Sequence, residues 1–600
     1  MRRATHRPPR PCSRPPPVGS APRAPRPARR CVHLVVSHPR HARDGAAEPD
    51  RPRAYGLVTS RRPAPGPRRR CYGSLTCPRE AWEPVAPAPS VEDVLLTRPR
   101  PGARPDGTTG LAPRSPAAVA VGAVGVGAVL AYVLTALARI GYPYELQYFE
   151  GSTVEVSARV TEGLPLYAAP TTGFTPWPYP PLYFWVTGEL ARVTGLSLPT
   201  LRAVSFVASL AALALVVLVV RHVSGSLAAG LGAAGLFAGT YWVSAAWFDA
   251  ARVDSLLLAL VLGAAYAALR ARTWRGGLLV GALFLLAFLT KQNALAVAAP
   301  VLAWLLWRRR SAGVAASALL AGGAVGSVLL GDALTGGWYS PYVVGQLLGQ
   351  GADLQWLAAF WVVDVALPFA VVLLGALLLW VHRGRPWPRR PGEDTQLVLA
   401  ACLGLALAAL AGRLHDGGYV NVAIPVHAAT AVLLGLGIAA VLRTRRALVG
   451  LGAAALVALQ VVVMTRWHTG LVPTAADRAA GDALVAQLSR LPGPVLVLSH
   501  PYYARLAGAP PHASLIAVDD LLATRPGPAR DALAAQLPWS LDGVDAVVLD
   551  SPEHAALFGG RLERDFTLVT TDLVPGDVFL PPTDVATKPA LLYVRKESQP

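Results

Sequence analysis

The chain has 600 residues, of which 53% are hydrophobic and only 15% are charged, and its mean hydropathy is +0.41. Soluble domains carry about 25% charged residues, so this composition argues against an ordinary soluble protein and for a membrane protein. The formal net charge of +19 would by itself suggest a nucleic-acid or anionic-membrane partner.

Most of the positive charge lies in the N-terminal segment, residues 1–115. This segment has 23 arginines, no lysine and 8 acidic residues, a net charge of +15, and four of the five cysteines. Its Pro/Arg/Ala-rich sequence lacks apolar periodicity and cannot bury enough surface to offset the entropy of ordering. We expect a disordered, solvated tail rather than an arm for RNA or anionic lipid, so nucleic acid is not an expected partner.

Long apolar runs alternate with short polar breaks over residues 116–464. A bilayer requires helices of about 17–25 residues, and the runs predict a mainly α fold, a polytopic transmembrane bundle of about 11 helices. The shorter run at 183–193 predicts a helix lying in the membrane interface. The expected transmembrane helices are 117–138, 199–220, 227–247, 255–269, 276–290, 293–307, 312–330, 356–380, 395–411, 422–441 and 447–464.

Arginine clusters occur in alternate loops between these helices, and cytoplasmic loops are enriched in Lys and Arg. The clusters lie at 221, 270–275, 308–310, 383–390 and 443–446. This pattern predicts a multi-pass protein of the plasma membrane, with a cytoplasmic N-terminus and with the intervening loops outside.

Residues 465–600 have a different pattern, in which amphipathic helical stretches alternate with short β-rich runs such as PVLVLSH and VDAVVLD. This alternation predicts a small α/β domain, which the topology places outside the membrane. His500, at the end of the first of these runs, is as compatible with a strand-end turn as with a site.

The first external loop carries Glu145 and Glu150 directly after the first helix. Partial desolvation raises the pKa of a carboxylate at a membrane interface and suits it to act as a general base. Solvated negative charges on an external loop are the alternative interpretation.

Further ionisable residues lie at other external helix junctions. Asp249, Arg252 and Asp254 form the FDAARVD junction, and Lys291 stands alone between two apolar helices in a chain with three lysines. Charges at membrane depth mark a polar pathway or pair with one another. Lys291 could meet a phosphate, or it could snorkel to lipid headgroups.

The last polar cluster is GRLHDGGYVN. One His beside one Asp is a weak metal signal, so we expect no metal site there, although a divalent metal stays possible as a cofactor. Helix capping or turn formation is the alternative role. The cluster contains Arg413, His415, Asp416, Tyr419 and Asn421.

Taken in order, these motifs resemble the GT-C superfamily of integral membrane glycosyltransferases, in particular the protein mannosyltransferase and aminoarabinose transferase type of family 39. The resemblance covers residues 117–464 and rests on ELQYFEG, PPLYFW, FDAARVD, LTKQN and GRLHDGGYVN. It implies transfer of a sugar from a polyprenyl-phosphate donor to an acceptor hydroxyl on the external face, with inversion at the anomeric carbon. The acceptor is a cell-envelope glycan, a lipid or a protein.

The resemblance also implies roles for individual residues. Glu145 or Glu150 matches the carboxylate that activates the acceptor, although family members usually have Asp or Asp-Glu there. Lys291 and Arg252 match the cations that stabilise the leaving lipid phosphate. Asp249, Asp254 and the residues of GRLHDGGYVN would line the same chamber.

Two other functions are compatible with the pattern. A lipid-linked-sugar flippase or transporter also uses intramembrane charges, but transporters often contain internal repeats, and no repeat is evident here. A nonenzymatic membrane scaffold that presents the C-terminal domain is the third possibility.

Overall fold

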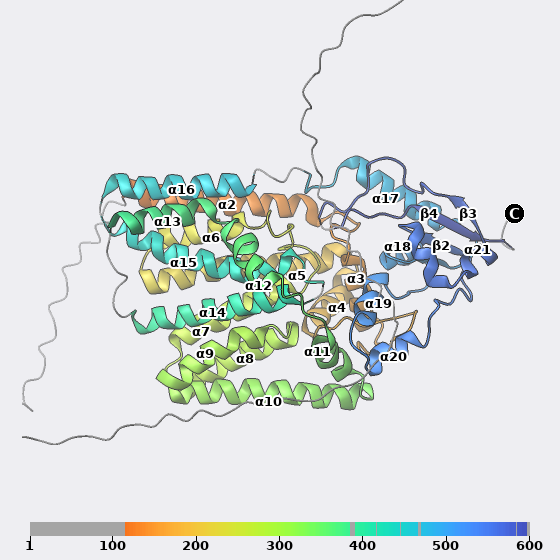
Figure 1. Cartoon of the computed structure of the whole chain (residues 1–600), viewed down its shortest axis with the longest axis horizontal. Coiled ribbons are helices and arrows are strands. Elements are labelled where there is room, and N and C mark those ends of the chain that lie inside the picture. The colour runs from red at the N-terminus through yellow and green to blue at the C-terminus, as the bar shows by residue number, and fades with distance from the viewer. Residues whose placement is uncertain are drawn as a thin grey trace, which may run out of the picture. The chain divides into compact units, whose positions relative to one another are not determined.

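The computed structural model describes residues 115–383, 391–415, 417–444, 446–465, 470–583 and 585–596. All but the last residue of the expected tail at 1–115 lie outside this range. The described chain is a bundle of long helices followed by a smaller part that contains a four-stranded sheet (Figure 1). These findings confirm the mainly α fold with a small C-terminal sheet.

The bundle helices follow the expected apolar runs. Six helices are long and apolar enough to cross a membrane, or up to seven if a bent pair counts as one span, within the described residues. The helices are α2 (Pro116–Ile140), α5 (Leu198–Ser224), α6 (Leu227–Gly239), α7 (Asp254–Arg270), α8 (Trp274–Thr290), α9 (Ala294–Arg308), α10 (Arg310–Thr335), α14 (Glu393–Leu414), α15 (Ile424–Leu442) and α16 (Ala447–Thr465). The chain is therefore a multi-pass membrane protein.

Small residues allow the bundle helices to pack closely. A Cβ atom added to Gly235 of α6 would lie 2.4 Å from the Cα atom of Gly125 in α2, so only glycine permits this approach. Such contacts stabilise helix pairs in lipid, where van der Waals packing replaces the hydrophobic effect.

The helix expected over 227–247 ends earlier, at Gly239, and this part of the prediction was wrong. The following segment 240–253 is irregular, with left-handed φ values of 51° at Ala245 and 54° at Ala246. Backbone groups freed in a membrane protein need partners from the protein. Arg139 supplies one, because its Nη2 donates to the Ala246 carbonyl at 2.5 Å.

The helix expected over 356–380 is broken. It consists of α12 (Trp356–Phe360), the π-helix η2 (Trp361–Ala366) and α13 (Ala370–Arg383), and the two halves are bent by 86°. Pro368 lies at the break, where proline cannot continue the helical hydrogen bonding. The Gln460 side chain of α16 replaces the lost bonds, since it donates to the Pro368 carbonyl and accepts from the amide of Val371.

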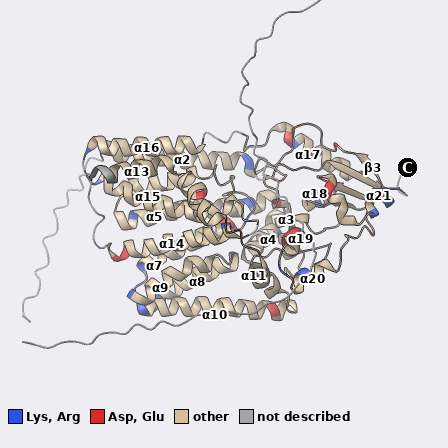
Figure 2. Cartoon of the chain, in the orientation of Figure 1, with Lys and Arg blue, Asp and Glu red and all other residues tan. Residues whose placement is uncertain are grey.

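Short helices occupy the connections at the end of the bundle nearest the sheet. The segment 183–193, for which a helix is expected, forms α4. These elements are α3 (Glu150–Thr161), α4 (Leu182–Thr194), the π-helix η1 (Pro341–Gln346), α11 (Leu347–Gly349) and the 3-10 helix η3 (Val420–Ala423). Figure 2 shows that Lys and Arg gather at the opposite end of the bundle, while the helical stretches between the ends carry few charges.

The C-terminal part alternates helices with strands, as its sequence pattern predicts. Its sheet has the order β1-β2-β4-β3; β1 and β2 are parallel, and the other neighbours are antiparallel. The ends of β1 and β2 therefore lie at the same edge. The elements are α17 (Ala475–Leu488), β1 (Val495–Val497), α18 (Pro501–Leu506), α19 (Leu515–Leu522), α20 (Pro528–Ala534), β2 (Ala546–Leu549), η4 (Pro552–Phe558), α21 (Arg561–Asp565), β3 (Phe566–Thr570) and β4 (Leu591–Arg595).

Candidate active site

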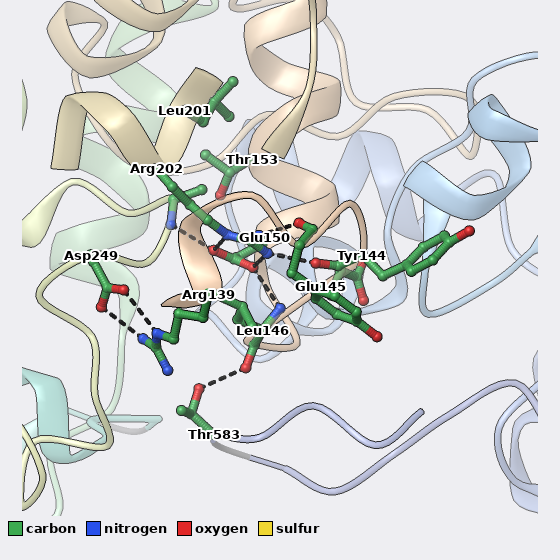
Figure 3. A network of polar contacts seen from close by, with 12 residues as sticks. Arg139, Tyr144, Glu145, Leu146, Glu150, Thr153, Leu201, Arg202, Asp249 and Thr583 are labelled. Carbon is green, nitrogen blue, oxygen red and sulfur yellow. Dashed lines mark hydrogen bonds and ion pairs between the residues drawn. The ribbon is translucent and has the colours of Figure 1, made fainter. Parts of the chain in front are cut away.

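Glu150, the first residue of α3, is fully buried and fully hydrogen-bonded (Figure 3). Its Oε1 accepts from Arg202 Nε at 2.9 Å and from the Ala251 amide at 2.7 Å, and its Oε2 accepts from Arg202 Nη2 at 2.5 Å and from the Leu146 amide at 2.7 Å. Burial raises the pKa of Glu150, but Arg202 and the two amides outweigh this effect and hold the pKa below its usual range. Each carboxylate oxygen thus already holds two donors.

Asp249 is in a similar closed pair. Arg139 at the end of α2 donates from Nε and Nη2 to the two Asp249 oxygens at 2.8 and 2.7 Å, and both side chains are fully buried. A bidentate pair of this kind connects α2 to the irregular segment 240–253.

Glu145 is equally buried but makes different contacts. Its Oε2 lies 2.5 Å from His500 Nδ1, and its Oε1 is buried without a hydrogen-bond partner among the described residues. Burial raises the pKa of Glu145, and the neighbouring His500 opposes this shift. Glu145 therefore has a free acceptor oxygen, which Glu150 lacks.

His500 continues this contact into the C-terminal part of the chain. Its Nε2 lies 3.0 Å from Asp550 Oδ2, which also accepts from the Thr587 hydroxyl at 2.5 Å. Neither His500 nor Asp550 was predicted as a site residue from the sequence. A signal was available, because His500 and Asp550 follow β1 and β2, two adjacent parallel strands whose ends lie at one edge of the sheet.

Arg252 and Lys291 meet at Tyr179. The Lys291 ammonium lies 5.3 Å from the centre of the Tyr179 ring, and Arg252 Nη2 lies 3.3 Å from the Tyr179 hydroxyl. Lys291 also pairs with Asp254 at 2.8 Å. The residues predicted as a phosphate-binding pair, far apart in the sequence, thus lie around one aromatic ring.

The Arg252 guanidinium lies within an aromatic cage, 4.8 Å from the ring centre of Phe149 and 5.0 Å from that of Trp247. No carboxylate among the described residues lies within salt-bridge distance of it, and its Nε is buried without a hydrogen-bond partner. The Arg252 charge also acts on Asp520 of α19. Burial raises the pKa of the Asp520 carboxyl to about 7, against the opposing effect of Arg252. Arg252 is therefore the less neutralised of the two cations.

Two residues of the GRLHDGGYVN motif also lie here. The buried Asn421 side chain lies beside Asp254, and the Tyr419 ring lies 5.6 Å from that of Trp247 in the Arg252 cage. The structure therefore brings this motif to the FDAARVD junction.

The N-terminal half of the motif lies in another cluster. Arg413 Nε pairs with Asp364 of η2 at 3.0 Å and its guanidinium lies 3.6 Å from the Trp356 ring centre, while His415 forms a backbone bridge with Ala352. Asp416 lies outside the described residues. Within the part of the chain that the structure describes, no group of three or more His, Cys, Asp or Glu residues could hold a metal ion.

Two adjacent aromatic residues, Tyr148 and Phe149, connect the Glu145–His500 contact with the Arg252 guanidinium. The Tyr148 ring lies 5.5 Å from His500, and the neighbouring Phe149 ring lies 4.8 Å from the Arg252 guanidinium. Tyr148 and Phe149 stand between Glu145 and Glu150 in the chain. The loop that carries Glu145 thus also forms one wall of the Arg252 cage.

Residues 178–330 match the family model described as PMT_2, dolichyl-phosphate-mannose-protein mannosyltransferase. The matched segment includes Tyr179, Arg252, Asp254 and Lys291. It does not include Glu145, which lies earlier in the chain.

Solved structures with similarity to the chain include two membrane enzymes. One is the crystal structure of ArnT from Cupriavidus metallidurans bound to undecaprenyl phosphate, with 14% identity, a TM-score of 0.49, and coverage of 79% of this chain and 99% of that chain. Another is the archaeal oligosaccharyltransferase AglB from Archaeoglobus fulgidus in complex with an inhibitory peptide and a dolichol-phosphate, with 12% identity, a TM-score of 0.43, and coverage of 79% and 75%. A comparison with curated protein sequences gives no match.

The family-model match confirms the resemblance to integral membrane glycosyltransferases of the GT-C superfamily. Over residues 178–330 the chain is thus similar to a family of sugar transferases.

Proposed function

We propose that this protein transfers a sugar from a polyprenyl-phosphate donor to a hydroxyl of a glycan, lipid or protein of the cell envelope. The observation that carries this proposal is the short connection between two groups with complementary chemistry. Glu145 offers a free carboxylate oxygen, Arg252 offers a cation without a bound carboxylate, and the Tyr148–Phe149 pair joins them.

The donor phosphate binds at Arg252 and Lys291. A guanidinium and an ammonium around one tyrosine ring can each donate to phosphate oxygens. They also stabilise the negative charge that grows on the phosphate as the sugar leaves. Asp254 keeps Lys291 paired in the absence of a donor.

Glu145 acts as the general base. The acceptor oxygen forms a new bond to the anomeric carbon while the bond from that carbon to the phosphate oxygen breaks, and the electron pair of the broken bond stays on the polyprenyl phosphate. The acceptor proton passes to Glu145 Oε1. Glu150 is the poorer candidate, because its two oxygens already accept four hydrogen bonds.

The lipid chain of the donor lies in an apolar cavity of about 750 Å³ beside this site. The cavity is lined mainly by α10 and the segment between α3 and α4. Leu289 and Pro181 are also in its lining, two residues from Lys291 and from Tyr179 in the chain, respectively. Exposed leucines of α10 at its border, such as Leu334, suit contact with lipid. A single groove can therefore receive the polyprenyl chain while its phosphate reaches the cations.

The arginine clusters at the far end of the bundle support a cytoplasmic N-terminus. In this orientation the site and residues 465–600 are extracytoplasmic, with 116–464 as the membrane catalytic domain and 1–115 as a cytoplasmic tail. The proposed location is the plasma membrane.

The test uses the full chain purified into lipid nanodiscs and a panel of radiolabelled polyprenyl-phosphate sugars, starting with mannose. We expect label to move to a hydroxyl acceptor, or slowly to water, with release of polyprenyl phosphate. Absence of transfer from every donor, together with absence of polyprenyl-phosphate binding, would refute the proposal.

A matched pair of lysine variants tests the phosphate site. Lys291→Ala should abolish transfer, because it removes one of two cations at the phosphate, and thermal unfolding is measured alongside because Asp254 loses its partner. Lys596→Ala is the control, since this exposed lysine contacts only backbone carbonyls in the C-terminal part. Normal transfer by well-folded Lys291→Ala would remove Lys291 from the mechanism.

A further inference from the structure

We propose that His500 and Asp550, from the C-terminal part of the chain, are positioning residues that hold Glu145 ionised and oriented as the base. The inference rests on the proposed function of Glu145. It assigns part of the active site to the C-terminal domain, outside the segment that matches the family model.

The geometry is a continuous buried chain of four side chains. Glu145 Oε2 contacts His500 Nδ1, His500 Nε2 contacts Asp550 Oδ2, and the Thr587 hydroxyl donates to the same Asp550 oxygen. The His500 and Glu145 side chains are 1% and 0% exposed. At this burial a polar group is costly unless it is hydrogen-bonded, so the chain has a defined structure.

Charge balance requires a cation in the middle of this chain. An imidazole between two ionised carboxylates must donate from both ring nitrogens, and only the protonated ring can do so. Burial disfavours the charged ring, but Asp550 and Glu145 outweigh it and raise the pKa of His500 to about 10. The imidazolium in turn lowers the pKa of Glu145, although burial outweighs this effect and the pKa stays above its usual value.

A second, independent contact fixes the other Glu145 oxygen. A Cβ atom added to Gly151 would lie 2.0 Å from Glu145 Oε1, so the carboxylate packs directly against the glycine backbone. Oε2 is held by His500, and Oε1 is confined yet without a hydrogen-bond partner among the described residues. The carboxylate is therefore locked, with one oxygen that carries no hydrogen bond among the described residues.

Attachment of the C-terminal domain does not depend on His500. Arg505, on the helix that follows His500, pairs with Glu155 of α3 at 2.7 and 2.8 Å and with Glu162 at 2.9 Å. This cluster joins α18, which follows His500, to α3 and its C-cap residue, which follow Glu145 in the chain, and it does not contact Glu145. The chain thus contains a control ion pair close to the His500 contact but separate from Glu145.

Two substitutions of His500 separate its two contacts. Asn places its amide nitrogen near the position of Nδ1 and can still donate to Glu145, whereas Gln reaches the position of Nε2 and can still donate to Asp550. We expect His500→Gln to lower kcat about 10- to 100-fold, the range for loss of a hydrogen bond to a charged group. His500→Asn should retain more of kcat, and the donor KM should change less than twofold in both.

The pH dependence of kcat distinguishes the positioning role of His500 from a purely structural role, which would leave this dependence unchanged. Glu145 must be ionised to accept a proton, and loss of the imidazolium raises its pKa. The decline of kcat at low pH, its acidic limb, should therefore begin about one pH unit or more higher than in the wild type. The value of kcat should recover as the pH is raised further. The other titratable and charged groups facing Glu145 are Glu150 and Tyr148 from the same loop and α3, Tyr502 and Tyr503 from α18 and Asp550 after β2, and all are unchanged in these variants.

Arg505→Gln is the control for loosening of the interface. It should leave both the plateau of kcat and the acidic limb within about twofold or 0.3 pH units of wild type, since Arg505 does not contact Glu145. Because Glu155 is buried, loss of its partner should instead lower the stability of the fold. Thermal unfolding of every variant in nanodiscs identifies loss of fold separately.

The outcomes separate the two proposals. Absence of transfer by the wild type would refute the proposed function, whereas normal kcat and an unmoved acidic limb in both folded His500 variants would refute only the positioning role. Solid-state NMR of ¹⁵N-histidine-labelled protein adds a readout independent of activity. The resonance lost in His500→Asn should report a protonated ring up to about pH 9 in the wild type, and a neutral ring at pH 8 would contradict the inference.

Discussion

Glu145 and Glu150 are two buried carboxylates five residues apart in the chain, and their surroundings differ sharply. Glu150 accepts four hydrogen bonds from Arg202 and two backbone amides. Glu145 has one partner, His500, and one oxygen without a hydrogen bond among the described residues. Residue type and burial are the same, so the number and position of donors distinguish them.

The two environments suit the two buried carboxylates to different roles. Saturation with donors fixes a carboxylate and lowers its basicity, as is suitable for an anchor between α3, α5 and the irregular segment 240–253. A half-satisfied carboxylate keeps a basic oxygen but costs stability. That cost is consistent with a catalytic role at Glu145.

The largest expected effect is that of Glu145→Gln, which removes the base and keeps the shape. We expect kcat for transfer from a polyprenyl-phosphate sugar to fall about 10²- to 10⁴-fold, the contribution of general base catalysis. Binding of polyprenyl phosphate, measured by fluorescence quenching, should be unchanged. Full activity of a folded Glu145→Gln variant would exclude this residue as the base.

Glu150→Gln should act on stability instead. It leaves the fully buried Arg202 guanidinium without a counter-charge, and breaking a buried pair costs about 3–5 kcal/mol. The measurement is the free energy of unfolding in nanodiscs, with Glu162→Gln at the other end of α3 as a control expected to cost less than about 1 kcal/mol. Loss of transfer with unchanged stability would reverse the roles of the two carboxylates.

The sequence predicted the helices well because apolar runs of membrane length have few other structures available. It also predicted the order of helices and strands after residue 465, where the periodicity changes. It failed at 240–247 and at Pro368, where side chains distant in the sequence, Arg139 and Gln460, compensate the broken backbone.

The site was predictable in part. Lys291 and Arg252 were selected because charges are rare and costly in this chain, and the structure places both at Tyr179. The choice between Glu145 and Glu150 was not possible, because it depends on Arg202, 52 residues from Glu150, and on His500, 355 residues from Glu145. No local pattern contains such pairings.

Arg252→Lys extends the comparison to the cations, of which Lys291 is paired and Arg252 is not. The variant keeps the charge but loses the planar group that stacks between Phe149 and Trp247. Cation–π contacts of a desolvated guanidinium contribute about 1–2 kcal/mol, so the affinity for polyprenyl phosphate should fall about tenfold. Lys291→Arg keeps its charge beside Asp254 and should change the affinity less, and an equal loss in the two variants would contradict the distinction between the cations.

The smallest expected effect concerns the apolar cavity beside the cations. Leu330 of α10 lines it and is 60% exposed, so Leu330→Trp can fill part of the groove from the lipid side without disturbing a packed core. The KM for a long-chain polyprenyl-phosphate sugar should rise about fivefold, which corresponds to about 1 kcal/mol. The KM for a donor with only two isoprene units should stay the same, because its chain is too short to fill the cavity. An equal change in KM for both donors would show that the groove does not bind the distal lipid chain. Such a result would leave the roles of Glu145 and Arg252 unaffected, because Leu330→Trp leaves every charged residue in place.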